Sequence, residues 1–179
     1  MNLPNKLTIL RVFMIPLFII FLMTSLGGSF HNKIAGVIFI LASLTDTLDG
    51  YLARKNNEVT VFGKFMDPLA DKLLVCSALI CLTDLHRIPS WIVIIIVARE
   101  FIISGFRLVA AEKGVVIAAS YWGKIKTVVQ MLMVILMVFD LGGPFRIVEQ
   151  VLMWAALILT VISLVDYLRK NISVLKEVH

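Results

Sequence analysis

The chain has 179 residues, of which 60% are hydrophobic, and its mean hydropathy is +0.97. Soluble domains are only about half apolar, so this composition excludes an ordinary soluble protein and indicates an integral membrane protein. The net charge is +5, but no basic stripe with interleaved aromatic residues occurs, so we expect no nucleic-acid partner.

Six apolar stretches recur along the chain, each close to the ~20 residues that a helix needs to cross a bilayer. They lie at about 7–25, 34–53, 65–83, 90–110, 124–140 and 147–168. Clusters of glycine and proline separate several of them, where loops are needed. We therefore predict an all-α protein, an integral membrane bundle of six transmembrane helices that forms a single domain over residues 1–179.

The basic residues predict how this bundle is oriented. If both termini are cytoplasmic, 14 of the 17 Lys and Arg residues fall toward the inner side, and only Lys33, Arg87 and Arg146 fall outside. This is the positive-inside pattern of multi-pass membrane proteins. The excess of positive charge also suits contact with anionic membrane lipids.

Four aspartates lie in the second and third predicted spans at helical spacing. Asp49 lies three positions after Asp46, and Asp71 lies four positions after Asp67, so each pair occupies one face of its helix. Both pairs flank the same short inner connection, so we expect them at similar depth, open to the cytoplasm. Uncompensated acids are very unfavourable in a membrane, so cations must neutralise them or they must be protonated.

Carboxylate oxygens are the ligands that Mg²⁺ and Mn²⁺ prefer, and a pair of such ions can clamp a phosphoryl group. Gly50 and Gly63 would let a bulky ligand or a neighbouring backbone come close, and Arg54 is suited to bind phosphate oxygens. Each of these three residues also has a purely structural explanation. The four aspartates do not, and they predict a site for divalent metal.

The aspartates belong to the pattern D-x2-D-G-x2-A-R-x8-G-x3-D-x3-D over residues 46–71. This pattern resembles, at every fixed position, the motif of the CDP-alcohol phosphatidyltransferase family. The resemblance implies the CDP-alcohol phosphotransferase fold and a homodimeric membrane enzyme. Such an enzyme uses the hydroxyl of a small alcohol to displace CMP from a CDP-linked lipid.

The resemblance also implies roles for individual residues. Asp46 and Asp67 would contact both metal ions, Asp49 one of them, and Asp71 the other while serving as general base. The cytidine diphosphate site would be lined by Asp46 and by Asn5, Thr8, Gly50, Arg54 and Thr60.

Four further stretches are similar to bacterial members of this family that use sn-glycerol 3-phosphate as the acceptor alcohol. They are residues 2–11, 62–68, 98–107 and 123–130. This similarity implies CDP-diacylglycerol as the donor, sn-glycerol 3-phosphate as the acceptor, and a bacterial cell membrane as the location.

A group of basic residues supports a phosphorylated acceptor independently of that similarity. Arg99 lies well inside the fourth span, where a lone charge is costly, and Arg107 follows two helical turns later. Lys124 and Lys126 begin the fifth span, so the four residues would form a basic pocket for the acceptor phosphate. Alternatively, Arg99 is satisfied by Glu100, by Asp140 or by a backbone carbonyl.

Other functions fit the sequence less well. An ion-coupled transporter would also carry intramembrane acids, but the chain shows no inverted halves and no matched pair of broken helices. A structural subunit would explain the hydrophobicity but not the aspartates. Within the enzyme class, the alternative is a family member whose acceptor is an inositol phosphate.

Overall fold

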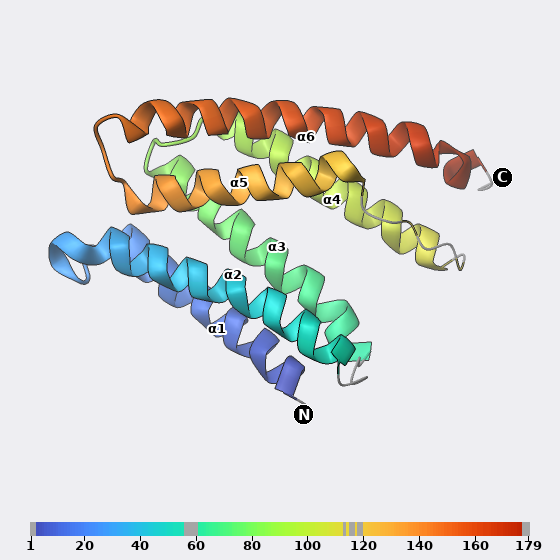
Figure 1. The fold of residues 1–179 in the computed structure, drawn as a ribbon, viewed down its shortest axis with the longest axis horizontal. Coiled ribbons are helices and arrows are strands. Elements are labelled where there is room, and N and C mark those ends of the chain that lie inside the picture. The colour runs from blue at the N-terminus through green and yellow to red at the C-terminus, as the bar shows by residue number, and fades with distance from the viewer. Residues whose placement is uncertain (1–2, 56–60, 113, 115–116, 118–119, 177–179) are drawn as a thin grey trace. The chain divides into compact units, whose positions relative to one another are not determined.

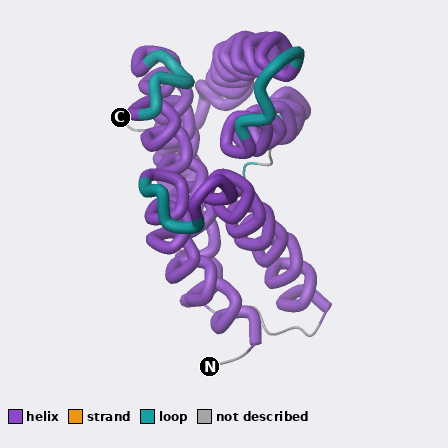
Figure 2. Tube along the Cα trace, turned by 90° about the vertical axis from the view of Figure 1, so that its left-hand side faces the viewer, coloured by secondary structure: helices purple, strands orange, loops and turns teal. Residues whose placement is uncertain are grey.

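The structure is a computed structural model that describes residues 3–55, 61–112, 114, 117 and 120–176. Over these residues the chain forms six long α-helices and one short 3-10 helix, with no strand (Figures 1 and 2). The all-α architecture predicted from hydropathy is confirmed. The helices are α1 (Leu3–Met23), η1 (Gly28–Phe30), α2 (His31–Lys55), α3 (Val61–Asp84), α4 (Ser90–Glu112), α5 (Tyr121–Phe139) and α6 (Phe145–Lys176).

The helices fall into two compact units, each described here by itself. The first unit comprises Met1–Arg87 and Val134–Leu141, which contain α1, α2, α3 and the end of α5. The second comprises Ile88–Met133 and Gly142–His179, which contain α4, the rest of α5 and α6. The assignment of residues 1–179 to one catalytic domain stays a prediction.

In the first unit, α1 packs against both α2 and α3, and α1 and α2 lie side by side (Figure 1). Phe18 and Phe39 are fully buried between α1 and α2, with ring centroids 5.5 Å apart. Gly36 on α2 gives room to the ring of Phe139 at the end of α5. A Cβ atom at position 36 would lie only 2.5 Å from Cε2 of that ring, so this approach requires glycine.

The loop that follows α3 also belongs to the first unit. Its backbone forms a Schellman cap: the amide of His86 donates to the carbonyl of Thr83, and that of Arg87 to Leu82. His86 occupies the left-handed position of this cap, with φ of 55°, where glycine is usual. The cap directs Arg87 toward the end of α5, where its Nη1 lies 2.9 Å from Oδ1 of Asp140.

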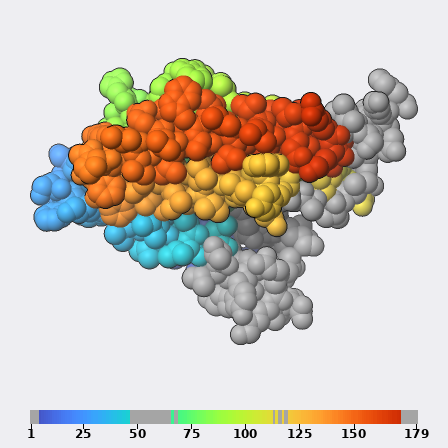
Figure 3. Space-filling view, turned by 45° about the horizontal axis from the view of Figure 1, so that its top comes forward, coloured from blue at the N-terminus to red at the C-terminus, as the bar shows by residue number. Residues whose placement is uncertain are grey.

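In the second unit, α4 packs against α6. The rings of Trp91 and Trp154 lie 6.0 Å apart across this contact, and Ile92 and Ile96 are fully buried. One face of α6 exposes apolar side chains, among them Ile147, Val151 and Ile158, and Figure 3 shows part of this helix, in orange and red, at the surface. So much exposed apolar surface suits a lipid environment better than water.

Three helices are apolar and long enough to cross a membrane by length and composition, among the residues described: Asn5–Met23, Tyr121–Phe139 and Phe145–Asn171. Helices α2, α3 and α4 are also long enough to cross a bilayer, and each carries ionisable residues, such as Asp46, Asp71 and Arg99. These are the helices on which the sequence predicts the functional site.

Helix α6 runs to Lys176, well beyond the predicted end of the sixth span near residue 168. The first added residues, Arg169, Lys170 and Asn171, are polar, and local contacts hold two of them to the preceding turn. Lys170 Nζ lies 2.8 Å from Asp166 Oδ1 one turn earlier, and the side-chain amide of Asn171 donates to the carbonyl of Tyr167. Hydropathy marks only the apolar part of such a helix, whereas pairs of this kind, one turn apart, support its continuation through polar residues.

Candidate functional site

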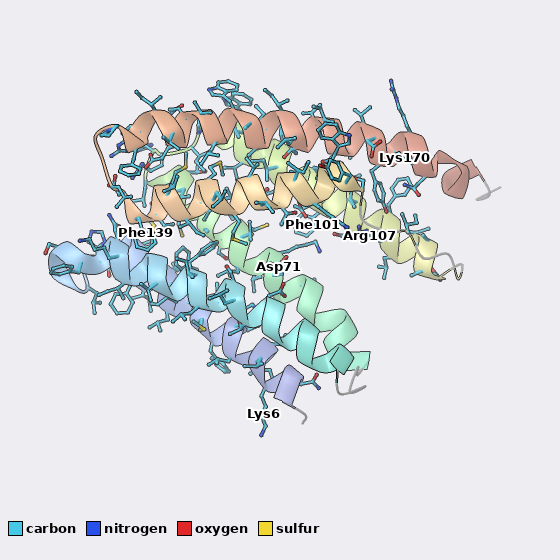
Figure 4. All side chains as sticks on the ribbon, in the orientation of Figure 1. Lys6, Asp71, Phe101, Arg107, Phe139 and Lys170 are labelled. Carbon is cyan, nitrogen blue, oxygen red and sulfur yellow. The ribbon has the colours of Figure 1, made fainter. Side chains whose placement is uncertain are left out.

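The predicted metal site belongs to the first unit. Asp46 lies on α2 with 39% of its side chain exposed, and Asp71 lies on α3 (Figure 4), a helix in contact with α2. Asp49, Gly50 and Arg54 continue α2, and Asp67 lies on α3. The side chains of Asp49, Arg54 and Asp67 lie outside the described part of the structure, and so does the whole of Thr60.

Asp46 has a cationic partner on α1. The side chain of Arg11 is fully buried, and its Nη1 lies 2.7 Å from Oδ1 of Asp46. Its Nε donates to Oγ1 of Thr45 at 3.3 Å, which fixes the plane of the guanidinium group. A cation of the chain itself, Arg11, therefore pairs with the first aspartate of the motif.

The sequence assigned no role to Arg11, but its spacing carried a signal. Asn5, Thr8 and Arg11 recur at every third residue of α1, so they share one face of the helix. In the structure all three are buried, with exposed fractions of 8%, 1% and 0%. Three buried polar residues in register on a membrane helix indicate a polar site beside them.

The described residues suit a hard divalent cation but do not by themselves complete a metal site. No group of three His, Cys, Asp or Glu comes together among the described side chains, which include Asp46 and Asp71 of the four aspartates. Carboxylate oxygen is the donor that Mg²⁺ and Mn²⁺ prefer. The half-exposed carboxylate of Asp46 is accessible to such an ion.

The predicted acceptor pocket belongs to the second unit, where a carboxylate joins two of its basic residues. Nη1 of Arg99 lies 2.9 Å from Oε1 of Glu100, and Lys126 on α5 forms an ion pair with the same oxygen. Arg99 Nε also donates to Oγ of Ser163 on α6, at 3.1 Å. Arg99 and Lys126 are both buried, so α4, α5 and α6 share a polar cluster.

These contacts confirm one of the alternatives for Arg99, its pairing with Glu100, while Asp140 pairs with Arg87 instead. An anionic ligand is therefore not needed to explain why Arg99 is inside a span. Two cations nevertheless share one carboxylate, so Arg99, Lys126 and Glu100 together keep an excess of positive charge. Sequence spacing did not indicate that Glu100 also reaches Lys126.

Gly123 on α5 allows the Arg99 guanidinium to approach the helix backbone. A Cβ atom at position 123 would lie 3.1 Å from Nη2 of Arg99, closer than ordinary contacts. The absence of a side chain at Gly123 therefore helps to position the guanidinium group of Arg99. This role could not be predicted from a glycine at the start of an apolar helix.

The other two predicted acceptor residues lie apart from this cluster. Arg107 is exposed on α4 (Figure 4), and its guanidinium carbon lies 6.0 Å from the ring centroid of Tyr167 on α6. Lys124 is exposed in the first turn of α5. The described contacts thus unite Arg99 with Lys126 through Glu100 and direct Arg107 to Tyr167.

Comparison with known proteins bears on what this site does. A family model described as CDP-alcohol phosphatidyltransferase matches residues 1–162. The chain is 44% identical over 189 residues to a CDP-diacylglycerol–glycerol-3-phosphate 3-phosphatidyltransferase of Bacillus subtilis, covering 98% of this chain and 97% of that protein. It is 42% identical over 173 residues to the protein of the same name in Haemophilus influenzae, covering 94% and 92%. A probable phosphatidylglycerophosphate synthase of Mycobacterium tuberculosis is 44% identical over 172 residues, covering 94% and 81%.

Proposed function

Because this chain belongs to the CDP-alcohol phosphatidyltransferase family, we propose that it transfers the phosphatidyl group of CDP-diacylglycerol to sn-glycerol 3-phosphate. The products are phosphatidylglycerophosphate and CMP, so the enzyme acts in phospholipid biosynthesis. The observation that carries this proposal is the 44% identity, over nearly the whole chain, to a relative whose name states this donor and acceptor.

The chain is a membrane protein, since three of its helices suit a bilayer and its family is one of membrane enzymes. We place it in a bacterial cell membrane as a multi-pass protein, with the aspartates facing the cytoplasm. The bacterial relatives and the distribution of basic residues support this location.

The reaction is a single displacement. Asp71 takes the proton from a hydroxyl group of sn-glycerol 3-phosphate, and the hydroxyl oxygen attacks the phosphorus that carries the diacylglycerol. The bond from this phosphorus to the bridging oxygen of the diphosphate breaks, and CMP leaves with that oxygen. Asp46, Asp49, Asp67 and Asp71 would hold two divalent cations, Mg²⁺ or Mn²⁺, which neutralise the diphosphate and make the attacking hydroxyl more acidic.

Two sets of residues bind the substrates in this scheme. The CDP-lipid contacts Asn5, Thr8, Asp46, Gly50, Arg54 and Thr60. Asn5 and Thr8 are polar and buried, which supports the proposal that the first turns of α1 lie beside the nucleotide. The acceptor phosphate contacts Arg99, Arg107, Lys124 and Lys126, and the positive excess of the Glu100 cluster supports an anionic acceptor. The active enzyme is a homodimer in which each chain forms one catalytic domain.

The decisive experiment measures CMP release by purified protein in detergent with CDP-diacylglycerol and a panel of alcohols. We expect release with sn-glycerol 3-phosphate and little with glycerol, serine or inositol. The matched control is Asp71→Asn, which keeps the size of the side chain but cannot accept the proton. Preference for an inositol phosphate would replace the proposed acceptor, and the absence of CMP release with every alcohol would contradict an enzyme of this class.

A further inference from the structure

A buried tyrosine on α6 carries a hydroxyl group that the fold does not satisfy. Tyr167 is 2% exposed, and its hydroxyl has no hydrogen-bond partner among the described residues. Buried polar groups are nearly always paired, because burying one without a partner costs stability. A phenylalanine would fill the same space without this cost, so the hydroxyl calls for an explanation beyond packing.

The ring of Tyr167 is held from two sides by residues of α4. Phe106 contacts it edge to face, with centroids 6.1 Å apart and an interplanar angle of 88°. The guanidinium group of Arg107 lies over the ring face, 6.0 Å from its centroid. These two contacts pack the ring of Tyr167 against α4.

Two residues on one face of α6 each contact an arginine of the proposed acceptor pocket, and Tyr167 is the second of them. One helical turn before it on the same face of α6, Ser163 accepts a hydrogen bond from Arg99. Its own ring contacts Arg107, so α6 links Arg99 and Arg107 through Ser163 and Tyr167. Tyr167 therefore contacts one cation of that pocket directly and lies one helical turn from a residue that binds the other.

We propose that the hydroxyl of Tyr167 is a binding group for the acceptor and donates a hydrogen bond to one of its phosphate oxygens. The inference rests on the proposed function, because it names a further residue of the same acceptor pocket. A phenol can donate to a phosphate oxygen, and such a charge-assisted bond is stronger than one between neutral groups. Binding of a phosphate monoester satisfies the hydroxyl that folding leaves unpaired.

Tyr167→Phe tests the proposal, since it removes the hydroxyl and keeps the ring. We expect the KM for sn-glycerol 3-phosphate to rise about tenfold to a hundredfold, the range for a lost hydrogen bond to a charged group. The KM for CDP-diacylglycerol should change less than twofold. Thermal unfolding in detergent should occur at the same or a higher temperature, because the variant removes an unsatisfied buried group.

The matched control is Tyr121→Phe, which removes a tyrosine hydroxyl at an exposed position on α5. It should leave both KM values unchanged. An unaltered acceptor KM in Tyr167→Phe, or a rise that accompanies a lower unfolding temperature, would overturn the assignment of the hydroxyl. Failure of the proposed function would look different, because the unmodified protein would then release no CMP with sn-glycerol 3-phosphate.

Discussion

Arg11 and Asp46 join the first helix to the first acid of the metal motif, with Arg11 Nη1 2.7 Å from Asp46 Oδ1. The arginine is fully buried and the aspartate is partly exposed, so the pair is intermediate between a surface ion pair and a fully buried one. Surface pairs contribute ~0–1 kcal/mol, whereas breaking a fully buried pair costs ~3–5 kcal/mol. We expect Arg11→Ala to destabilise the protein by about 2 kcal/mol, measured by thermal unfolding in detergent.

Lys6→Ala is the control for this variant, because Lys6 is an exposed cation on the same helix (Figure 4). It should leave the unfolding temperature within error of the unmodified protein. Equal effects of the two substitutions would show that Arg11 contributes only charge. Arg11→Lys should recover part of the stability, since an ammonium group keeps the charge but cannot reach both Asp46 and Thr45.

Asp71→Asn should abolish CMP release while keeping the affinity for CDP-diacylglycerol within a factor of about ten. An amide cannot take the proton from the attacking hydroxyl, and loss of a general base commonly costs ~10²–10⁴-fold in rate. Steady-state assays and a lipid-binding titration measure the two quantities separately. Asp84→Asn, at the other end of α3, is the control and should leave the rate unchanged. Near-normal turnover by the Asp71 variant would rule out its role as base.

Removal of divalent metal should stop the reaction reversibly. The predicted ligands are all carboxylates, so activity lost in EDTA should return with Mg²⁺ or Mn²⁺. Ca²⁺ should bind and raise the unfolding temperature but support little turnover, because it is larger and less strict in geometry. Full activity after exhaustive chelation would mean that the aspartates serve another purpose.

Arg107→Ala should raise the KM for sn-glycerol 3-phosphate strongly and change the KM for CDP-diacylglycerol little. A lost charge-assisted hydrogen bond of ~1.5–3 kcal/mol corresponds to roughly a tenfold to hundredfold effect. Arg107→Lys should rescue only part of the loss, because an ammonium group cannot fork onto two oxygens. Arg169→Ala, an exposed cation on α6, serves as the control. A larger effect on the lipid substrate would assign Arg107 to the diphosphate or to lipid headgroups.

Gly36→Ala should destabilise the first unit by about 1–2 kcal/mol. The added methyl group would overlap the ring of Phe139, and such overpacking costs more than the ~1 kcal/mol by which alanine favours a helix. Thermal unfolding in detergent measures the change. Adding Phe139→Leu should restore part of the stability by making room.

Gly105→Ala is the matched control, because a Cβ atom at that helical glycine meets nothing within 4 Å. It should stabilise the protein by up to about 1 kcal/mol through helix propensity alone. If both alanine variants shifted the unfolding temperature in the same direction, the contact between Gly36 and Phe139 would not govern the packing of α2.

The helices and the acidic motif could be predicted because they depend on residues close together in sequence. Apolar stretches of membrane length mark the helices, and the spacing from Asp46 to Asp71 marks the motif. Hydropathy did not indicate how far α6 continues, because Arg169, Lys170 and Asn171 after the apolar span are polar and local pairs such as Lys170 with Asp166 support the helix there.

The ion pairs that shape the two sites could not be predicted in the same way. Arg11 and Asp46 are 35 residues apart, and Glu100 and Lys126 are 26 apart. Which side chains meet over such separations depends on how the helices pack, and sequence periodicity alone does not determine this. Glu100 illustrates the limit, because its pairing with Arg99 was one of several alternatives and its contact with Lys126 was not foreseen.

The discontinuous first unit has a consequence for how the chain is made. Its last segment, Val134–Leu141, follows α4 in the chain and brings Phe139 to Gly36 and Asp140 to Arg87. During synthesis from the N-terminus, α1, α2 and α3 therefore emerge before the segment that closes their unit. The nascent protein must hold these three helices in the bilayer, incompletely assembled, until the ribosome has passed the end of α5.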